Sequence, residues 1–177
     1  MQNVEIKARC RDLQPVHDIL VGKGLKRVAR MRQVDTYFST PQGRLKLREI
    51  DGRRVELISY RRPDVRGMRA STYSVVKVND LPGMRAVLSG VLGVRVIVAK
   101  TRDLYKWEST RVHLDAVDGL GTFVELETTV YGQELQTAER ECMSVFGALD
   151  LDEGDILAPS YVDLLEATGG ISSPAAS

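Results

Sequence analysis

Hydrophobic and polar residues alternate along several short segments of this chain. Residues 3–9 read Asn-Val-Glu-Ile-Lys-Ala-Arg, with polar side chains at the odd positions and apolar ones between them. Residues 44–48 and 111–115 repeat the alternation. In residues 123–127, Phe and two Glu occupy every second position and would share one face of a strand. Because successive side chains of a β-strand point to opposite faces, each segment predicts a strand with one ionic and one apolar face.

The wider pattern predicts eight strands, over residues 2–9, 25–39, 44–50, 53–62, 71–78, 94–107, 110–117 and 120–131. Turn signals at 40–43, 51–52 and 118–119 separate several of them, and the long second strand is expected to contain a bulge. Apolar residues at helical spacing predict a helix after the first, fifth and eighth strands, the third over 134–149, and a short helix over 159–167. Asp12 and Asp80 are the expected N-caps of the first two helices.

Short turns favour an antiparallel meander that closes into a barrel. The predicted fold is therefore an α+β fold, an eight-stranded antiparallel β-barrel whose apolar outer face is covered by the amphipathic helices. One domain is expected over residues 1–168. A mobile basic loop is predicted over 62–69, and a disordered tail, composed of small and polar residues, over 169–177.

Composition excludes several classes of protein. The formal net charge is +1 over 177 residues, which argues against a dedicated nucleic-acid-binding surface. The two cysteines, Cys10 and Cys142, have no metal-binding spacing and read as reduced thiols. The N-terminus has no apolar signal core, and no apolar segment approaches the roughly 18 residues of a membrane helix. A cytoplasmic location without membrane attachment is expected.

The ionic faces allow two arrangements. They can meet water on the outside of an open sheet, which periodicity alone favours because charged outer faces are the normal case. If they line a barrel instead, buried cations cost several kcal/mol each without partners, and a polyanion bound by Lys and Arg would neutralise them. Clustered carboxylates would repel one another, and a hard divalent cation relieves that repulsion. The barrel arrangement thus predicts a triphosphate site with Mg²⁺. Its cations would be Lys7, Arg9, Lys46, Arg48, Lys100, Arg102 and Arg111, and its carboxylates Glu5, Glu125 and Glu127.

Several motifs along the chain, together with their order, resemble those of the CYTH superfamily, which is named for class IV adenylyl cyclases and thiamine triphosphatases. The most specific is Arg111-x-His113-Leu114-Asp115, followed by Gly119-Leu120-Gly121-x-Phe123-x-Glu125-x-Glu127. The others are Glu5-x-Lys7, Leu45-Lys46-Leu47-Arg48, the segment 57–63, Lys100-x-Arg102 with Tyr105, and Ser160-Tyr161-x-Asp163-Leu164-Leu165. The resemblance implies a triphosphate tunnel that takes Mg²⁺ or Mn²⁺ and a triphosphate-bearing small molecule, in a monomer or a homodimer.

The resemblance also assigns roles to individual residues. Glu5, Glu125 and Glu127 would hold metal, and Asp115 would help with metal or orient a basic residue. Lys7, Arg61 and Glu127 are the implied catalytic residues. The implied phosphate-binding residues are Lys7, Arg9, Lys46, Arg48, Arg61, Lys100, Arg102 and Arg111.

Two positions depart from the family pattern. Asn3 stands where the first glutamate of the signature is usual, so one metal site is expected to be weaker. Residues 71–73, Ser-Thr-Tyr, stand where many relatives place charges, so one end of the substrate is expected to be held differently. His113 shares the parity of Arg111 and is expected to face the interior, where a histidine is more often satisfied by a neighbouring charge than catalytic.

The expected activity is hydrolysis of an inorganic, thiamine or nucleoside triphosphate. A class IV adenylyl cyclase, which forms cyclic AMP and pyrophosphate from ATP, is the first alternative, because both reactions stabilise the same developing charge. A non-catalytic polyphosphate or nucleotide sensor is the second alternative, on account of Asn3.

Overall fold

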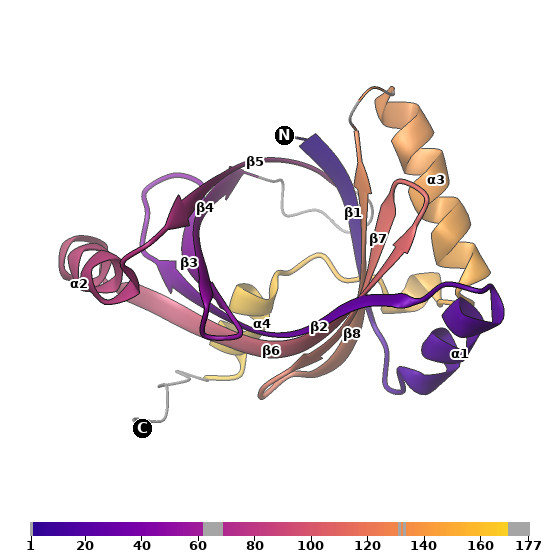
Figure 1. The fold of residues 1–177 in the computed structure, drawn as a ribbon, viewed down its shortest axis with the longest axis horizontal. Coiled ribbons are helices and arrows are strands. Elements are labelled where there is room, and N and C mark those ends of the chain that lie inside the picture. The colour runs from indigo at the N-terminus through magenta and orange to yellow at the C-terminus, as the bar shows by residue number, and fades with distance from the viewer. Residues whose placement is uncertain (1, 62–68, 131, 133, 170–177) are drawn as a thin grey trace.

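The protein folds as a closed antiparallel β-barrel with helices on its outside (Figure 1). The structure is a computed structural model and describes residues 2–61, 69–130, 132 and 134–169. The order of strands around the barrel is β1-β5-β4-β3-β2-β6-β7-β8, and β8 pairs back with β1. The strands are β1 (Gln2–Arg9), β2 (Arg27–Phe38), β3 (Arg44–Ile50), β4 (Arg54–Arg61), β5 (Arg69–Val78), β6 (Val94–Trp107), β7 (Thr110–Val117) and β8 (Gly121–Thr129). The predicted barrel is confirmed.

Tight turns join the consecutive strands on most of the barrel. The β3–β4 hairpin turns at Asp51 and Gly52, both of which have a positive φ (52° and 63°). Such backbone suits Gly and, less well, Asp, and the turn was expected at these two residues. The register of β2 against β6 shifts between Arg27 and Ala29, so the predicted bulge is present as well.

Two helices cover the outer face of β1, β7 and β8. They are α1 (Gln14–Gly22) and α3 (Leu135–Ala148). Their apolar sides share one core with the apolar parity of the strands, in which Ile6, Leu126 and Phe146 are almost fully buried. The prediction that Asp12 is the N-cap of α1 is wrong. Leu13 holds that position, and the Asp12 carboxylate accepts the backbone N–H of Gln14 at 2.9 Å.

The second helix, α2 (Leu81–Leu92), does not cover the barrel. Its predicted N-cap is confirmed, because Asp80 accepts the backbone N–H of Gly83 at 3.0 Å. However, no residue of α2, all of which lie in the described part of the chain, is fully buried, and Val91 is 78% exposed. Figure 1 shows α2 projecting beside the barrel. The expectation that every amphipathic helix would cover the outer face is therefore wrong for α2.

The last helix, α4 (Tyr161–Ala167), packs against the barrel after a short 3₁₀ turn at Glu153–Asp155. Ser160 caps it, and its side chain and that of Asp163 form a reciprocal capping box. Tyr161 and Val162 pack with Phe123 in a second apolar cluster. None of the described helices is long and apolar enough to cross a membrane. The loop expected over 62–69 and the tail expected over 169–177 lie, apart from their end residues 69 and 169, outside the described residues.

Candidate functional site

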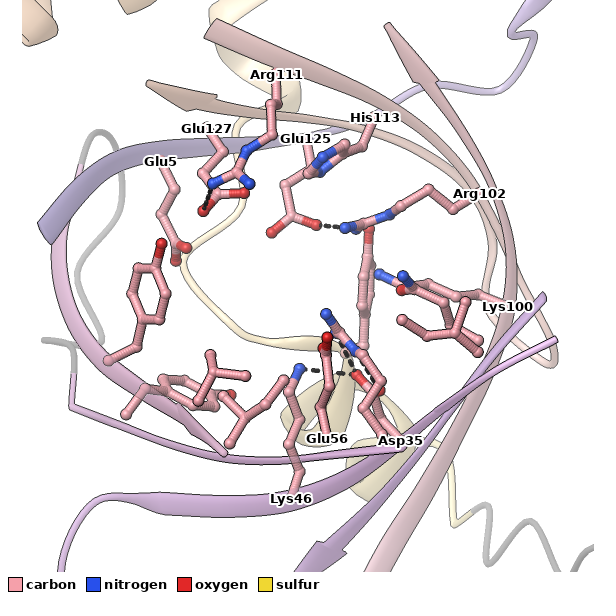
Figure 2. Close-up of a pocket in the computed structure, with 18 of the residues that line it drawn as sticks. Glu5, Asp35, Lys46, Glu56, Lys100, Arg102, Arg111, His113, Glu125 and Glu127 are labelled. Atoms are coloured by element: carbon pink, nitrogen blue, oxygen red, sulfur yellow. Dashed lines mark hydrogen bonds and ion pairs between the residues drawn. The ribbon is translucent and has the colours of Figure 1, made fainter. Parts of the chain in front are cut away.

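The inside of the barrel is an ionic cavity of about 430 Å³ (Figure 2). Every strand contributes to its lining, and Ser160 and Tyr161 add the start of α4. The described residues that line it include seven cationic side chains and five carboxylates. The cations are Lys7, Lys46, Arg48, Arg54, Lys100, Arg102 and Arg111, and the carboxylates are Glu5, Asp35, Glu56, Glu125 and Glu127. The ionic parity thus faces inward, as the barrel arrangement predicted.

Asp35 on β2 holds two of the predicted phosphate-binding residues. Its carboxylate accepts hydrogen bonds from Arg48 Nε and Nη2, both at 2.7 Å, and from Lys46 Nζ at 2.8 Å. Burial alone would raise the pKa of Asp35, but Arg48 and Lys46 outweigh it and hold that pKa far below its usual range. The sequence reasoning missed Asp35. The sequence did hold a sign of its role, because Asp35 alternates with Gln33 and Tyr37 on one face of β2, and all three line the cavity.

Asp115 on β7 plays the same part for a second pair. It accepts two hydrogen bonds of 2.6 Å from Arg102, one of 3.0 Å from Lys100 Nζ, and one of 2.9 Å from the Tyr161 hydroxyl. Asp115 is fully buried and is not among the residues that line the cavity. Its oxygens accept hydrogen bonds from two cations and a hydroxyl, a placement that matches the second implied role, to orient basic residues. The metal role implied for Asp115 stays a prediction.

Glu125 joins this ionic cluster from β8. It accepts a 2.6 Å hydrogen bond from Arg102, and its register partner on β1 is Lys7. Burial alone would raise the pKa of Glu125, but Lys7 and Arg102 outweigh it and keep the carboxyl ionised. Lys7 Nζ also lies 3.7 Å from the centroid of the Tyr161 ring, a cation–π contact that holds the ammonium inside the cavity.

Glu5 and Glu127 lie directly opposite each other on β1 and β8. Both point into the cavity in Figure 2, near Arg111. Glu127 accepts a 2.9 Å hydrogen bond from Arg111 and a second from the Asn3 amide. The Asn3 carbonyl in turn accepts the Ser71 hydroxyl at 2.7 Å. The amide that replaces the usual glutamate is thus a neutral partner of the carboxylate beside it.

A divalent cation fits this corner of the cavity only in part. Among the described residues, no group of three or more His, Cys, Asp or Glu side chains is arranged to hold a metal ion. Nevertheless, Glu5 and Glu127 are directly opposite in register, an arrangement in which like charges destabilise a sheet. A hard cation removes that repulsion, and Mg²⁺ is commonly held by one or two carboxylates together with phosphate oxygens. The two residues can therefore supply two carboxylates to a cation, and the described part of the chain brings no third such ligand beside them.

Two predicted phosphate-binding residues lie outside the cavity lining. Arg61 is exposed and donates to the Gln42 side chain at 3.1 Å. On β4 the even-numbered residues face the lumen, so the odd-numbered Arg61 points to the outside of the barrel. The catalytic and phosphate roles implied for Arg61 are therefore not matched by its position. Arg9 has the lumen parity but is exposed at the end of β1, where it donates to the Leu120 carbonyl at 3.2 Å. Arg54 and Glu56, which sequence reasoning did not single out, line the cavity from β4.

His113 is buried in the cavity wall and faces Glu125 in register. Burial, together with nearby Arg102, lowers the pKa of His113 well below its usual value, so the imidazole is neutral. Lys100 is also perturbed, because burial and Arg102 lower its pKa to about 8 although Asp115 opposes the shift. Lys100 therefore loses its charge at a pH well below the usual range for a lysine.

Comparisons with known proteins agree with this fold. A Methanocaldococcus jannaschii protein, named as a candidate adenylate cyclase, is 29% identical over 175 residues, which cover 93% of this chain and 98% of that protein. A Pyrococcus horikoshii structure superposes with a TM-score of 0.82 at 22% identity, over 92% of this chain and 98% of that one. A Hippeastrum structure, described as a candidate adenylyl cyclase with a dominant triphosphatase activity, gives a TM-score of 0.66 at 15% identity, over 97% and 98% of the two chains. These two structures share the fold.

The family assignment follows from a match that spans most of the chain. The model of the CYTH domain matches residues 1–161. This range contains all eight strands of the barrel and each lumen carboxylate described above. The chain therefore belongs to the CYTH domain family.

Proposed function

We propose that this protein is a divalent-metal-dependent triphosphatase that hydrolyses a triphosphate inside the barrel. The observation that carries the proposal is the sharing of carboxylates in the lumen. Asp35 serves both Lys46 and Arg48, and one further buried carboxylate, Asp115, serves both Lys100 and Arg102. The Asp35 pair thus keeps one excess positive charge. At the second pair Arg102 also bonds Glu125, but Lys7 shares that carboxylate, so three cations there meet two carboxylates and again one positive charge is left for an anion.

The charges of the cavity support a requirement for metal. With a neutral imidazole, the seven lining cations exceed the five lining carboxylates by two, and buried Asp115 removes one more unit. This excess is smaller than the charge of a fully ionised triphosphate. A divalent cation at Glu5 and Glu127 would add two positive charges next to the cationic pairs, which brings the cavity closer to neutrality when the anion is bound.

The residues of the chain would divide the work of hydrolysis. Arg48 and Arg102, together with their lysine neighbours, would hold the phosphate oxygens and stabilise the charge that grows on the leaving phosphate. Their buried carboxylates would keep these donors in place before the substrate arrives, so no reorganisation is needed during the reaction. When bound, the cation would supply further charge neutralisation and orient the attacking water.

Cyclisation of ATP is a second candidate, because the Methanocaldococcus jannaschii relative is named as a candidate adenylate cyclase. The two reactions use the same phosphate-binding residues and differ in the nucleophile, which is water in one and the ribose 3′-hydroxyl in the other. The Hippeastrum protein, described as having a dominant triphosphatase activity, favours hydrolysis as the first proposal.

Product analysis tests the proposal directly. ATP, thiamine triphosphate and tripolyphosphate are offered with Mg²⁺ or Mn²⁺, and the products are resolved. Orthophosphate identifies the hydrolase, cyclic AMP the cyclase, and binding without turnover a sensor. Glu127→Gln should abolish turnover, whereas Glu134→Gln, which changes an exposed glutamate, should not. Full activity of Glu127→Gln would reject the metal assignment.

A further inference from the structure

We propose that an apolar wall on β4 and β5 binds a flat, uncharged ring, so that the preferred substrate is an organic triphosphate with an aromatic ring system rather than inorganic tripolyphosphate. This inference rests on the proposed function, because it names the substrate class of the same cavity. The wall consists of four lumen-facing side chains: Ile58, Tyr60, Tyr73 and Val75.

The strand register brings these four residues into one continuous surface. Tyr60 is directly opposite Tyr73, and Ile58 is directly opposite Val75. Residues two apart on a strand point to the same side, so the two pairs are stacked along the wall. Two rings and two branched side chains make a surface that is suited to stacking on a planar ring.

The wall is bounded by charged groups on both sides. β5 and β4 lie between β1 and β3 in the barrel, and in Figure 2 this sector, between Glu5 and Lys46, carries rings and branched apolar side chains. Lys46 Nζ lies 5.6 Å from the centroid of the Tyr60 ring. A ring on the wall would therefore place an attached phosphate beside a cation that the site already uses.

The wall has no positive charge that could bind an inorganic polyphosphate. None of its four residues is a cation, and the phosphate donors lie on β1, β3, β6 and β7 together with Arg54 at the start of β4. The cavity volume of about 430 Å³ falls within the range of roughly 300–1,000 Å³ that is typical of sites for organic ligands. An organic group beside the phosphates would bury apolar surface that an inorganic chain leaves wet.

The residues next to the wall on β1 and β5 are neutral. Ser71 lies two positions before Tyr73 on the same face of β5, and its hydroxyl donates to the Asn3 carbonyl on β1 at 2.7 Å. Neither side chain brings a charge to the place where the ring would lie.

The test compares three probes that share a triphosphate and differ in the attached group: ATP, ribose 5-triphosphate and inorganic tripolyphosphate. For each, kcat/KM is measured with Mg²⁺, and Kd by calorimetry. The wild-type protein should prefer ATP to ribose 5-triphosphate by at least about tenfold, since stacking of one base is commonly worth a factor of that order. Preference for any uncharged ring, and not only adenine, is checked with GTP and UTP.

Variants then locate the preference on the wall. Tyr73→Leu should lower the ratio of ATP to tripolyphosphate by about tenfold, and Tyr73→Phe, which keeps the ring, should preserve it. Val75→Gln tests the same wall at a side chain that is 43% exposed, where the fold should tolerate the change. Its matched control is Val76→Gln, at a neighbour that is 60% exposed on the opposite face of the strand.

The outcomes separate this inference from the proposed function. If tripolyphosphate is bound and hydrolysed as well as ATP, and the wall variants alter both equally, the ring site is rejected and the triphosphatase stands. If no probe is bound or hydrolysed, both proposals are rejected. A change of ratio in Val76→Gln equal to that in Val75→Gln would also reject the wall.

Discussion

The carboxylate of Asp35 receives both of its shortest hydrogen bonds from one guanidinium, that of Arg48, at 2.7 Å each. In this bidentate pair Asp35 is buried and Arg48 is half-buried, and the buried Lys46 shares the carboxylate. A carboxylate so placed orients two cations toward the lumen while neutralising only one of them. The Asp115 cluster repeats the arrangement on the next strands of the barrel, β6 and β7, so the two Lys-x-Arg segments of β3 and β6 are supported in the same way.

Removal of the Asp35 charge should destabilise the fold. Asp35→Asn leaves two buried cations without their carboxylate, and loss of one partner of a buried ion pair commonly costs about 3–5 kcal/mol in the free energy of unfolding. The control is Asp118→Asn, which breaks an exposed ion pair with Arg32 and should cost less than about 1 kcal/mol. Urea unfolding measures both values, and equal costs would contradict the shared-carboxylate interpretation.

The affinity for tripolyphosphate should fall as the pH rises from 7 to 9. Burial and Arg102 lower the pKa of Lys100 to about 8, so the ammonium is lost in this range, whereas a bound phosphate favours the charged form. Binding at pH 8 should therefore take up protons, which calorimetry in two buffers of different ionisation enthalpy detects. Lys100→Arg should remove the effect, because arginine stays protonated. Unchanged proton uptake in that variant would assign the titration to another group.

The lowered pKa of Lys100 affects the stability of the fold in the opposite direction from the affinity for tripolyphosphate. The usual pKa of lysine is 10.5 and the folded value is about 8, so between these values the unfolded chain binds more protons than the folded one. The contribution of Lys100 to stability therefore rises with pH in this window. A weaker affinity at high pH would thus not reflect unfolding caused by this group.

Restoration of the usual glutamate should make the fold depend on metal. Asn3→Glu places a carboxylate where the Asn3 amide now donates to Glu127, and carboxylates packed together repel. The melting temperature in chelator should therefore fall, and Mn²⁺ should raise it more than it raises that of the wild type. Asn3→Gln, which keeps an amide, is the control. An identical metal response of both variants would remove Asn3 from the metal site.

Arg61 and Arg111 should differ in their effect on turnover. Arg61 is exposed and outside the cavity lining, so Arg61→Ala should change kcat/KM by less than about twofold. Arg111 lines the cavity beside Glu127, and a hydrogen bond to a charged group is worth about 1.5–3 kcal/mol, so Arg111→Gln should lower kcat/KM by roughly tenfold or more. The reverse order would restore the role first implied for Arg61.

The placement of Arg61 shows that a motif resemblance does not determine which face of a strand a residue occupies. The hairpin at Asp51 and Gly52 was predicted, and its register pairs Lys46 with Ile58 and Arg48 with Glu56. Counting from that turn puts Arg61 on the outer face, so the information was present in the sequence. The motif resemblance alone did not carry it, because a resemblance matches residue types without fixing strand register.

By itself, the sequence determined the eight strands, the hairpin turns, the α2 cap at Asp80 and the ionic and apolar parities, because these depend on neighbours within a few residues. Tertiary structure alone decided that Asp35 and Asp115 each hold two cations, that α2 does not pack over the barrel as the other helices do, and that Glu5 lies opposite Glu127. Period-two alternation tells which face of a strand a side chain occupies. It does not tell which strand lies beside it, since closure of the barrel joins β1 to β8 across more than a hundred residues.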